Sequence, residues 1–332
     1  MRTVVLGGGS WGTALANLLA SQGFKTYIWL RDEKAARGIN ERRENTRYLP
    51  GLKLAPALTA TTDAAEAFDE AALCIMAIPC QSARAALKDM AGHFAPGLPV
   101  VCASKGIELT SLKPMSKLVA EELPQARYAI LSGPSFAAEV VKGMPTAVSI
   151  GCAEKALAEE LRAVFSCGTF RAYSSRDVIG VEMGGALKNV IAIAAGVSDG
   201  LGFGHNARAA LITRGLAEIS RLGEALGATA PTFMGLSGMG DLVLTCTGDL
   251  SRNRQVGLKL AQGKTLEVIT AEMHMVAEGI KTTEAAVALG DSLQVDLPIA
   301  CSVAALLAGE ISPTEAVKAL MERDLKEEFP GD

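Results

Sequence analysis

Three scarcities narrow what this chain can be. Only three of its 332 residues are histidine, so neither a histidine-rich metal site nor a mechanism driven by histidine is favoured. Aromatic residues make up only 5%, as expected where helices pack closely on each other or on a sheet. The seven cysteines are scattered, odd in number and form no C-x-x-C pair, which argues against a disulfide framework or a zinc site. We therefore expect no metal, and reduced thiols in a cytoplasmic protein.

Long apolar runs and an excess of one charge are also lacking. No segment reaches the ~18 consecutive uncharged apolar residues of a membrane span, and the apolar start, TVVLGGG, has neither the length nor the cleavage pattern of a signal peptide. The net charge of −4 provides no global attraction to nucleic acid or anionic lipid. We expect no nucleic-acid partner and no stable membrane insertion, so a local basic cluster must hold any anionic substrate.

What is present is the composition of a globular protein, with 49% hydrophobic and 20% charged residues in a chain long enough for two domains. In the first half, short apolar runs alternate with helical patterns such as Trp11–Ser21, Gln81–Met90 and Met115–Glu122. This alternation predicts a parallel sheet covered on both faces. The predicted strands are Thr3–Leu6, Thr26–Leu30, Leu73–Ile78, Val100–Ala103 and Ala129–Leu131.

The pattern changes past the middle of the chain. Thr146–Ile150 and Thr169–Ala172 bracket the helix Glu154–Phe165 and extend the predicted sheet, but from about Arg176 strand-like runs largely vanish. We predict one domain over residues 1–178 and an all-helical domain over residues 179–332. The helices expected there are Val178–Val197, Ala207–Leu226, Arg252–Gln262, Thr282–Ala288 and Ser302–Ala308.

A glycine-rich turn follows the first predicted strand. Gly7-x-Gly9-x-x-Gly12 comes directly after TVVL and opens a helix at Trp11. In this setting glycines let the backbone approach a pyrophosphate that faces the helix N-terminus. The plain alternative is a tight turn between strand and helix. With the strand–helix alternation, the motif predicts an α/β fold in which a Rossmann-type doubly wound parallel sheet is followed by the helical domain. The Rossmann-type domain is expected to bind NAD or NADP.

The end of the second predicted strand, Trp29-Leu30-Arg31-Asp32, is where a residue that recognises the adenosine ribose belongs. A carboxylate there accepts hydrogen bonds from the ribose hydroxyls of NAD, whereas an arginine can stack on adenine and bind the 2′-phosphate of NADP. Because Arg31 and Asp32 stand together, the preference stays open. Arg31 as a solvated surface charge is the alternative.

Lys188 lies in the run ALKNVIAIAAGV, residues 186–197, where Asn189 is the only other polar side chain. Burying an unpaired ammonium is costly, so Lys188 either extends over apolar surface to water or occupies a polar cavity. Beside a nicotinamide, a desolvated lysine is a candidate proton donor to a carbonyl that is being reduced.

Two further candidates lie at element ends. Lys105 closes the strand VVCASKG, at the edge where open α/β sheets bind ligands; a surface lysine in a turn is the alternative. Asp241 follows the glycine-rich run GLSGMG, and Thr245 comes one turn later if Asp241 begins a helix, so both can face one cavity. A helix N-cap is the alternative for Asp241, and the two roles are compatible.

The run Ser251-Arg252-Asn253-Arg254 supplies a basic cluster. An arginine near a helix start, with a serine hydroxyl and backbone N–H groups beside it, suits a phosphate group. An exposed charged turn is the alternative.

Together these segments resemble the NAD(P)-dependent sn-glycerol-3-phosphate dehydrogenases of the bacterial type. The resemblance spans most of the chain in the family's order, with Gly8, where the family often has alanine, and Met183 as conservative departures. The motifs that carry it are GGGSWGTALA (7–16), NTRYLPG (45–51), SKGIE (104–108), SGPSFAAEV (132–140), GVEMGGALKNVIAIAAG (180–196), GLSGMGDLVLTC (235–246), SRNR (251–254) and VAEGIKT (276–282).

The resemblance implies hydride transfer between NAD(P)H and dihydroxyacetone phosphate, which supplies sn-glycerol 3-phosphate for glycerophospholipid synthesis, and it implies a homodimer. Lys188 would exchange the proton, with Lys105 and Asp241 as further catalytic residues. With the glycine loop, the cofactor site would comprise Gly7, Gly9, Ser10, Trp11, Gly12, Arg31, Tyr48, Lys105, Ala137, Arg252, Val276 and Glu278. The substrate site would comprise Lys105, Gly133, Ser135, Lys188, Asn189, Asp241, Thr245, Ser251, Arg252 and Asn253.

Two other functions fit part of the pattern. A hydroxyacid dehydrogenase of the 3-hydroxyisobutyrate or 6-phosphogluconate kind also pairs a Rossmann domain with a helical partner and a catalytic lysine, but the GVEMGGALKN and SRNR stretches argue against it. A non-catalytic nucleotide sensor would not require Lys188, Asp241 and the basic cluster to converge.

Overall fold

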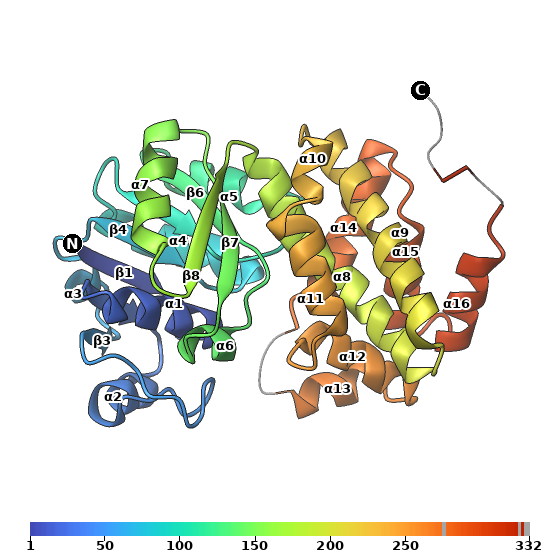
Figure 1. The fold of residues 1–332 in the computed structure, drawn as a ribbon, viewed down its shortest axis with the longest axis horizontal. Coiled ribbons are helices and arrows are strands. Elements are labelled where there is room, and N and C mark those ends of the chain that lie inside the picture. The colour runs from blue at the N-terminus through green and yellow to red at the C-terminus, as the bar shows by residue number, and fades with distance from the viewer. Residues whose placement is uncertain (274–276, 325–326, 329–332) are drawn as a thin grey trace.

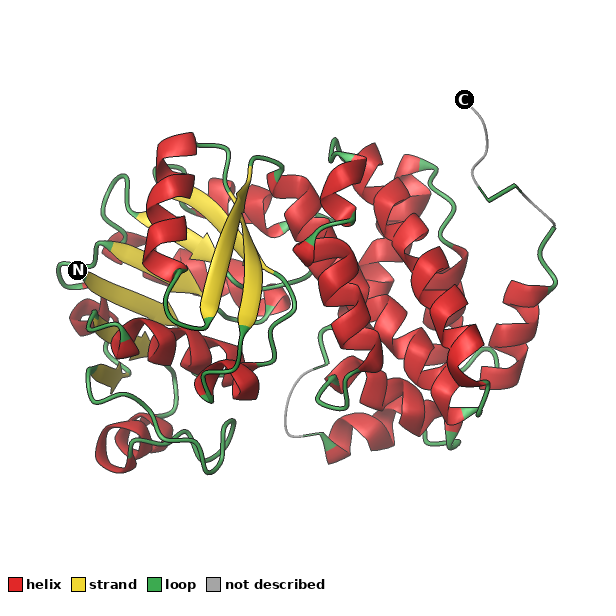
Figure 2. Cartoon of the chain, viewed as in Figure 1, coloured by secondary structure: helices red, strands yellow, loops and turns green. Residues whose placement is uncertain are grey.

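A sheet flanked by helices and a bundle of helices lie side by side in the computed structural model (Figures 1 and 2). The structure describes residues 1–273, 277–324 and 327–328. In this part of the chain every strand precedes residue 176, and every regular element after it is helical. The predicted fold class, an α/β unit followed by a helical unit, is confirmed.

The sheet has eight strands in the order β3-β2-β1-β4-β5-β6-β7-β8. All neighbours pair in parallel except β6 and β7, which are antiparallel. The strand bounds are β1 Arg2–Leu6, β2 Lys25–Trp29, β3 Leu58–Thr61, β4 Leu73–Met76, β5 Pro99–Cys102, β6 Arg127–Ser132, β7 Thr146–Gly151 and β8 Phe170–Ser175.

Helices cover both faces of the sheet, as alternate residues of β1 illustrate. Val5 packs on one face with Leu15 of α1, whereas Val4 and Leu6 pack on the other face with Leu87 of α4. Such strands are buried on both sides, which accounts for their continuous apolar runs. The helices of this unit are α1 Ser10–Ser21, α2 Glu33–Arg42, α3 Ala64–Phe68, α4 Cys80–Met90, α5 Met115–Glu122, α6 Ala137–Val141 and α7 Lys155–Phe165.

The sheet departs from the predicted parallel arrangement at one pair, β6 and β7. The connection between β6 and β7, residues 133–145, holds only the five-residue helix α6. Gly133, with φ of +146°, turns the chain at the end of β6, and a side chain there would meet the Cα of Val148 in β7 at 2.9 Å. The chain therefore turns back directly, and β7 pairs antiparallel with β6 because no parallel crossover forms between them.

The edge strand β3 and the polar helix α2 were not predicted. β3 reads LTAT, without a continuous apolar run, and it is held by a side chain from outside the sheet. Asn40 of α2 donates its Nδ2 to the carbonyl of Ala60 and accepts the N–H of Ala60, both at 2.8 Å. This pairing is tertiary, so no local pattern announces it.

The helical unit surrounds α8 Val178–Gly200, which starts beside the sheet and runs into the middle of the other helices (Figure 1). Gly196 of α8 and Gly257 of α12 let the two backbones touch, since side chains there would meet carbonyl oxygens of the facing helix at 2.1 and 2.0 Å. The other helices are α9 Gly204–Ala225, α10 Ala230–Phe233, α11 Asp241–Thr247, α12 Arg252–Ala261, α13 Leu266–Glu272, α14 Gly279–Leu293, α15 Pro298–Leu307 and α16 Pro313–Met321.

The helix α8 is long and apolar enough to cross a membrane, with a hydropathy of 1.5 over its most apolar window, yet 83% of that window is buried inside the protein. It is the core helix of its unit. Its buried Glu182 accepts hydrogen bonds from the N–H and Oγ of Ser116, at 2.7 and 2.6 Å, and from the hydroxyl of Tyr128 at 2.7 Å. Both Ser116 and Tyr128 belong to the sheet unit, so this carboxylate joins the two units.

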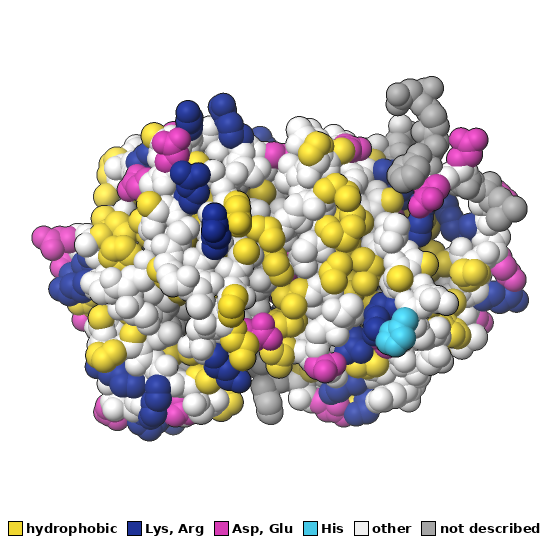
Figure 3. All heavy atoms as spheres, in the orientation of Figure 1, with side chains coloured by type: hydrophobic (Ala, Val, Ile, Leu, Met, Phe, Trp, Pro, Cys, Tyr) yellow, Lys and Arg dark blue, Asp and Glu magenta, His cyan; other side chains and the backbone are white. Residues whose placement is uncertain are grey.

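The surface carries no extended field of one sign on the face drawn in Figure 3, where Lys and Arg side chains are interspersed with Asp and Glu over both units.

The domain division that we predict after residue 178 stays a prediction, with β8 ending at Ser175 and α8 beginning at Val178.

Candidate active site

Two adjoining cavities lie between the carboxyl edge of the sheet and the helical unit. The larger, about 510 Å³, is lined by the glycine loop, the ends of β2 and β4, and the segment after β5. The smaller, about 270 Å³, reaches Lys188 on α8 and the start of α12. Both are lined by Ser10, Trp11, Tyr48, Ala103, Arg252 and Glu278, so they form one cleft.

The glycine loop has the geometry that a pyrophosphate needs. Side chains at Gly7 and Gly12 would meet the carbonyl oxygens of Ala77 at 2.4 Å and Gly7 at 2.0 Å, whereas a side chain at Gly9 would meet nothing within 4 Å. Glycine at 7 and 12 thus permits close backbone packing, and Gly9 opens onto space. As the N-cap of α1, Gly9 provides no side-chain cap to the first N–H groups, which leaves the helix N-terminus available to an anion.

A buried donor supports the same fit. The indole N–H of Trp11 is one of four buried side-chain groups without a hydrogen-bond partner in the described part of the chain, and Trp11 lines both cavities. A buried donor without a partner is costly, and a ligand acceptor would satisfy it. Asn45 steadies the loop beside it, since its Nδ2 donates to the carbonyl of Gly8 at 2.9 Å and to Thr13 Oγ1 at 2.8 Å.

Arg31 and Asp32 have different environments although both line the larger cavity. The carboxylate of Asp32 caps α2, because it accepts the N–H groups of Lys34 and Ala35 at 2.9 and 3.1 Å. Arg31 is exposed at the same end of the cavity, and Arg47 lines that cavity too.

Lys188 and Lys105 meet at one carboxylate. Lys188 Nζ donates to Asp241 Oδ1, and also to Thr245 Oγ1 at 2.9 Å. Lys105 Nζ donates to the other oxygen of Asp241, Oδ2, at 2.6 Å. The Lys188 side chain is 9% exposed and that of Asp241 is 1% exposed. Lys188 therefore lies in a polar cavity and does not extend over apolar surface to water.

Burial and charge act against each other in this group. Burial lowers the pKa of Lys188 to about 7, the Asp241 carboxylate opposes that effect, and the Lys105 ammonium reinforces it. Burial raises the pKa of Asp241, but Lys105 and Lys188 outweigh burial and hold it below its ordinary value. A buried lysine that titrates near neutrality can both donate and accept a proton.

The helix α11 does begin at Asp241, so Thr245 comes one turn later. The N-cap of α11 is Gly240, which has no side-chain cap, so capping is not the role of the Asp241 carboxylate. The hydroxyl of Thr245 donates to the carbonyl of Asp241 at 2.6 Å. That bond leaves an oxygen lone pair for Lys188.

The start of α12 forms the far wall of the smaller cavity. Ser251 caps α12 by accepting the N–H of Arg254 at 3.2 Å. Asn253 Nδ2 donates to Asn189 Oδ1 at 2.9 Å, and Asn253 Oδ1 accepts the N–H of Gly279 at 3.0 Å. The Arg252 side chain lines both cavities.

Two further charged residues, Arg254 and Glu278, lie near this wall. Arg254 bonds Asp199 and Asp249 and does not line either cavity. Burial raises the pKa of Glu278, against the nearby positive charges of Arg252, Lys105 and Lys188.

Two family models match this chain. The N-terminal model of NAD-dependent glycerol-3-phosphate dehydrogenase matches residues 2–158, and its C-terminal model matches residues 177–318. The chain belongs to this dehydrogenase family. The glycerol-3-phosphate dehydrogenase (NAD(P)+) of Nitratidesulfovibrio vulgaris (strain DP4) is 59% identical over 330 residues, which are 99% of this chain and 100% of the relative.

Solved structures agree with this family assignment. The glycerol-3-phosphate dehydrogenase of Coxiella burnetii superposes with a TM-score of 0.94 at 36% identity, covering 97% of this chain and 99% of that one. The enzyme from the yeast Saccharomyces cerevisiae superposes with a TM-score of 0.84 at 26% identity, covering 97% and 99%. The resemblance inferred from the motifs is confirmed.

Most residues that the dehydrogenase resemblance selects meet at the cleft. Gly12 and Gly133 do not line either cavity, Asp241 lies behind the two lysines, and Val276 falls outside the described residues. The residues that line it are Gly7, Gly9, Ser10, Trp11, Arg31, Tyr48, Lys105, Ser135, Ala137, Lys188, Asn189, Thr245, Ser251, Arg252, Asn253 and Glu278.

Sequence reasoning missed several residues around the cleft of this dehydrogenase. Leu49, Phe136 and Leu250 line the smaller cavity, and Asn45 holds the glycine loop. Asn45 opens the NTRYLPG motif, so the signal was present without a physical reason to read it. Within the described residues, no group of three or more His, Cys, Asp or Glu side chains could hold a metal ion.

The ion triad of Asp241, Lys188 and Lys105 predicts a stability effect. Asp241→Asn should cost about 3 kcal/mol of unfolding free energy, because removing one partner leaves buried positive charge without compensation. Urea-induced unfolding at pH 7 measures this loss. The same substitution in a Lys188→Met background should cost clearly less, and an unchanged unfolding midpoint for Asp241→Asn alone would contradict the prediction.

Proposed function

We propose that the protein interconverts dihydroxyacetone phosphate and sn-glycerol 3-phosphate with NAD(P)H, and so supplies glycerol 3-phosphate for glycerophospholipid synthesis. The observation that carries the proposal is the position of Lys188. It is buried against Asp241 in the cavity that adjoins the glycine loop. Membership of the dehydrogenase family supports the same reaction.

The glycine loop and the N-terminus of α1 would hold the cofactor's pyrophosphate, with Trp11, Tyr48, Ala137 and Glu278 along the rest of the cleft. When bound, the nicotinamide supplies or accepts the hydride. Lys188 gives its proton to the carbonyl oxygen during reduction and takes the hydroxyl proton during oxidation. Lys105 adds positive charge where negative charge develops on that oxygen.

Asp241 is the fixed negative charge of the site. It orients both ammonium groups by accepting one bond from each, on different oxygens. Because Asp241 stays ionised, Lys188 can gain or lose its proton while it remains hydrogen-bonded in place.

The substrate phosphate belongs at the start of α12. The protein is acidic overall, with a net charge of −4, so the dianion must be captured by local groups. Arg252 lines the cleft there, beside the helix N-terminus that Ser251 caps and the amide of Asn253. Arginine suits this role because its planar donors match phosphate oxygens. Ser135, Asn189 and Thr245 line the remainder of the smaller cavity.

Family membership argues against the two alternatives, a hydroxyacid dehydrogenase and a nucleotide sensor. A sensor also has no use for a lysine with a pKa near 7 beside the cofactor loop.

The cofactor preference follows from the roles of two neighbours. Asp32 is engaged in capping α2, so it is less free to bind ribose hydroxyls, while Arg31 and Arg47 both line the adenosine end of the cleft. We propose that both nucleotides serve, with a preference for NADPH. We further propose a cytoplasmic homodimer without stable membrane insertion and without a nucleic-acid partner.

The test of the proposed function is the rate of dihydroxyacetone phosphate reduction, with Lys188→Met as the decisive variant. It should lose activity by at least about a hundredfold while it keeps cofactor affinity. In the wild type, reduction needs protonated Lys188 and should fall as pH rises through about 7. Oxidation needs the neutral form and should rise over the same range. Turnover near the wild-type rate in Lys188→Met would rule out this mechanism.

A second test concerns cofactor choice. Arg31→Ala should raise the Kd of NADPH by about one decade, because it removes a charge-assisted bond to the 2′-phosphate, and should change that of NADH much less. Fluorescence titration of both nucleotides measures the two constants. Equal losses for both would assign Arg31 to adenine stacking instead.

The third test concerns the phosphate. Arg252→Ala should lower kcat/KM for dihydroxyacetone phosphate by about one to two decades and reduce its advantage over unphosphorylated dihydroxyacetone. Arg252→Lys should recover part, since lysine keeps the charge but not the planar fork. NADPH affinity must be measured in the same variants because Arg252 lines both cavities. Intact discrimination would place the phosphate elsewhere.

A further inference from the structure

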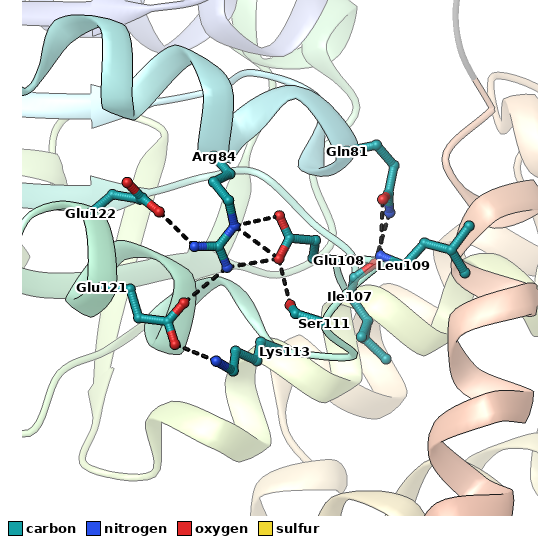
Figure 4. Close-up of polar contacts among 9 residues, drawn as sticks. All are labelled: Gln81, Arg84, Ile107, Glu108, Leu109, Ser111, Lys113, Glu121 and Glu122. Carbon is teal, nitrogen blue, oxygen red and sulfur yellow. Dashed lines mark hydrogen bonds and ion pairs between the residues drawn. The ribbon is translucent and has the colours of Figure 1, made fainter.

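We propose that Gln81 and Arg84 of α4 are positioning residues for Lys105. They fix the segment of residues 104–114, and through it the reach of Lys105 to Asp241. The inference rests on the proposed function, in which Lys105 acts at the reaction centre. Figure 4 shows the contacts of Gln81 and Arg84 with this segment and with α5.

Gln81 grips the backbone just beyond Lys105. Its Nε2 donates to the carbonyl of Ile107 at 2.8 Å, and its Oε1 accepts the N–H of Leu109 at 3.0 Å. One amide thus binds the segment two and four residues after Lys105, in the manner of a neighbouring strand. An alanine at position 81 would leave both backbone groups without these partners.

Arg84 grips the same segment through a side chain. Its guanidinium binds Glu108 by Nε at 2.9 Å and by Nη2 at 2.7 Å, and Glu108 is only 5% exposed. Glu108 also accepts the hydroxyl of Ser111. A bidentate contact of this kind fixes orientation as well as distance.

The guanidinium also ties the segment to α5. Arg84 Nη1 donates to Glu122 at 2.5 Å and Nη2 to Glu121 at 2.9 Å, while Lys113 binds the other oxygen of Glu121. One arginine therefore holds together three carboxylates from two parts of the chain. Without it the carboxylates would repel one another, and Glu108 would lose its bidentate partner in a buried place.

The other side of the segment faces the helical unit. Ile107 is 0% exposed and packs in the core of that unit. Gly106 has φ of +135°, and a side chain there would lie 3.0 Å from Cβ of Cys80 and 3.4 Å from Oγ1 of Thr282. The backbone next to Lys105 is thus confined from α4 on one side and α14 on the other, so Lys105 takes its place from these contacts.

A structural brace and a positioning device differ in their effect on Lys188. The charged and titratable groups around Lys188 are Asp241 and Cys246 on α11, Lys105, Glu278 before α14, and Arg252 of α12, which lines the same cavity. If Lys105 withdraws, Lys188 loses its nearest like charge and keeps Asp241, so its pKa rises. A brace that does not act through Lys105 leaves that pKa unchanged.

The experiment measures kcat for dihydroxyacetone phosphate reduction against pH, with both substrates saturating, in Arg84→Met, Gln81→Leu and Lys105→Met. Arg84→Met and Gln81→Leu should each lower kcat by about ten- to a hundredfold with the KM of NADPH within about twofold of wild type. In both, the descending limb near pH 7 should move upward by about 0.5 in pH or more. Arg84→Lys should recover part of the kcat.

Two controls make the outcome specific. Arg127→Met removes another arginine–carboxylate pair of the sheet unit, with Glu154, and should leave kcat and the pH profile unchanged. In a Lys105→Met background, Arg84→Met should add little further loss, because both act through the same ammonium.

The two proposals fail differently. If Lys105→Met is fully active, the role of Lys105 in the proposed function is wrong. If Lys105→Met is impaired while folded Arg84→Met and Gln81→Leu keep the wild-type kcat and pH profile, the positioning role is wrong. Should Arg84→Met not fold, Gln81→Leu and Glu108→Gln decide between the same two results.

Discussion

The contact on which the site depends is one carboxylate shared by two lysines from different units. Asp241 lies on α11, Lys188 on α8, and Lys105 on the segment that leaves β5. Burial alone would make either ammonium unfavourable, and the carboxylate alone would be as costly. Lys188 and Asp241 both belong to the helical unit, and Lys105 reaches Asp241 from the sheet unit, so the complete group depends on the docking of the two units.

Sequence reasoning predicted the parts that local patterns encode. The glycine loop, the alternation of strands and helices, and the apolar run around Lys188 all found their expected places. Asp241 begins α11 and Thr245 follows one turn later, so both side chains reach Lys188, although only Thr245 lines the cavity.

What could not be predicted is held by contacts distant in sequence. Strand β3 is stabilised by Asn40 from a neighbouring helix, and the antiparallel turn after β6 depends on close packing at Gly133. Asp32 left the cofactor preference open in the sequence, since only the structure shows its carboxylate engaged by the start of α2. The clamp of Arg84 on Glu108 likewise spans 24 positions and leaves no periodic signature.

The helix α8 is bonded to the sheet unit near its start and forms the core of the helical unit along the rest of its length. Glu182, near its start, is bonded to Ser116 and Tyr128 of the sheet unit, and Lys188 follows six residues later on the same unbroken helix. A continuous helix transmits displacement along its axis with little loss. The position of the Lys188 ammonium is therefore fixed relative to the sheet that would carry the cofactor. A rotation of the helical unit away from the sheet must either bend α8 or break the hydrogen bonds of Glu182.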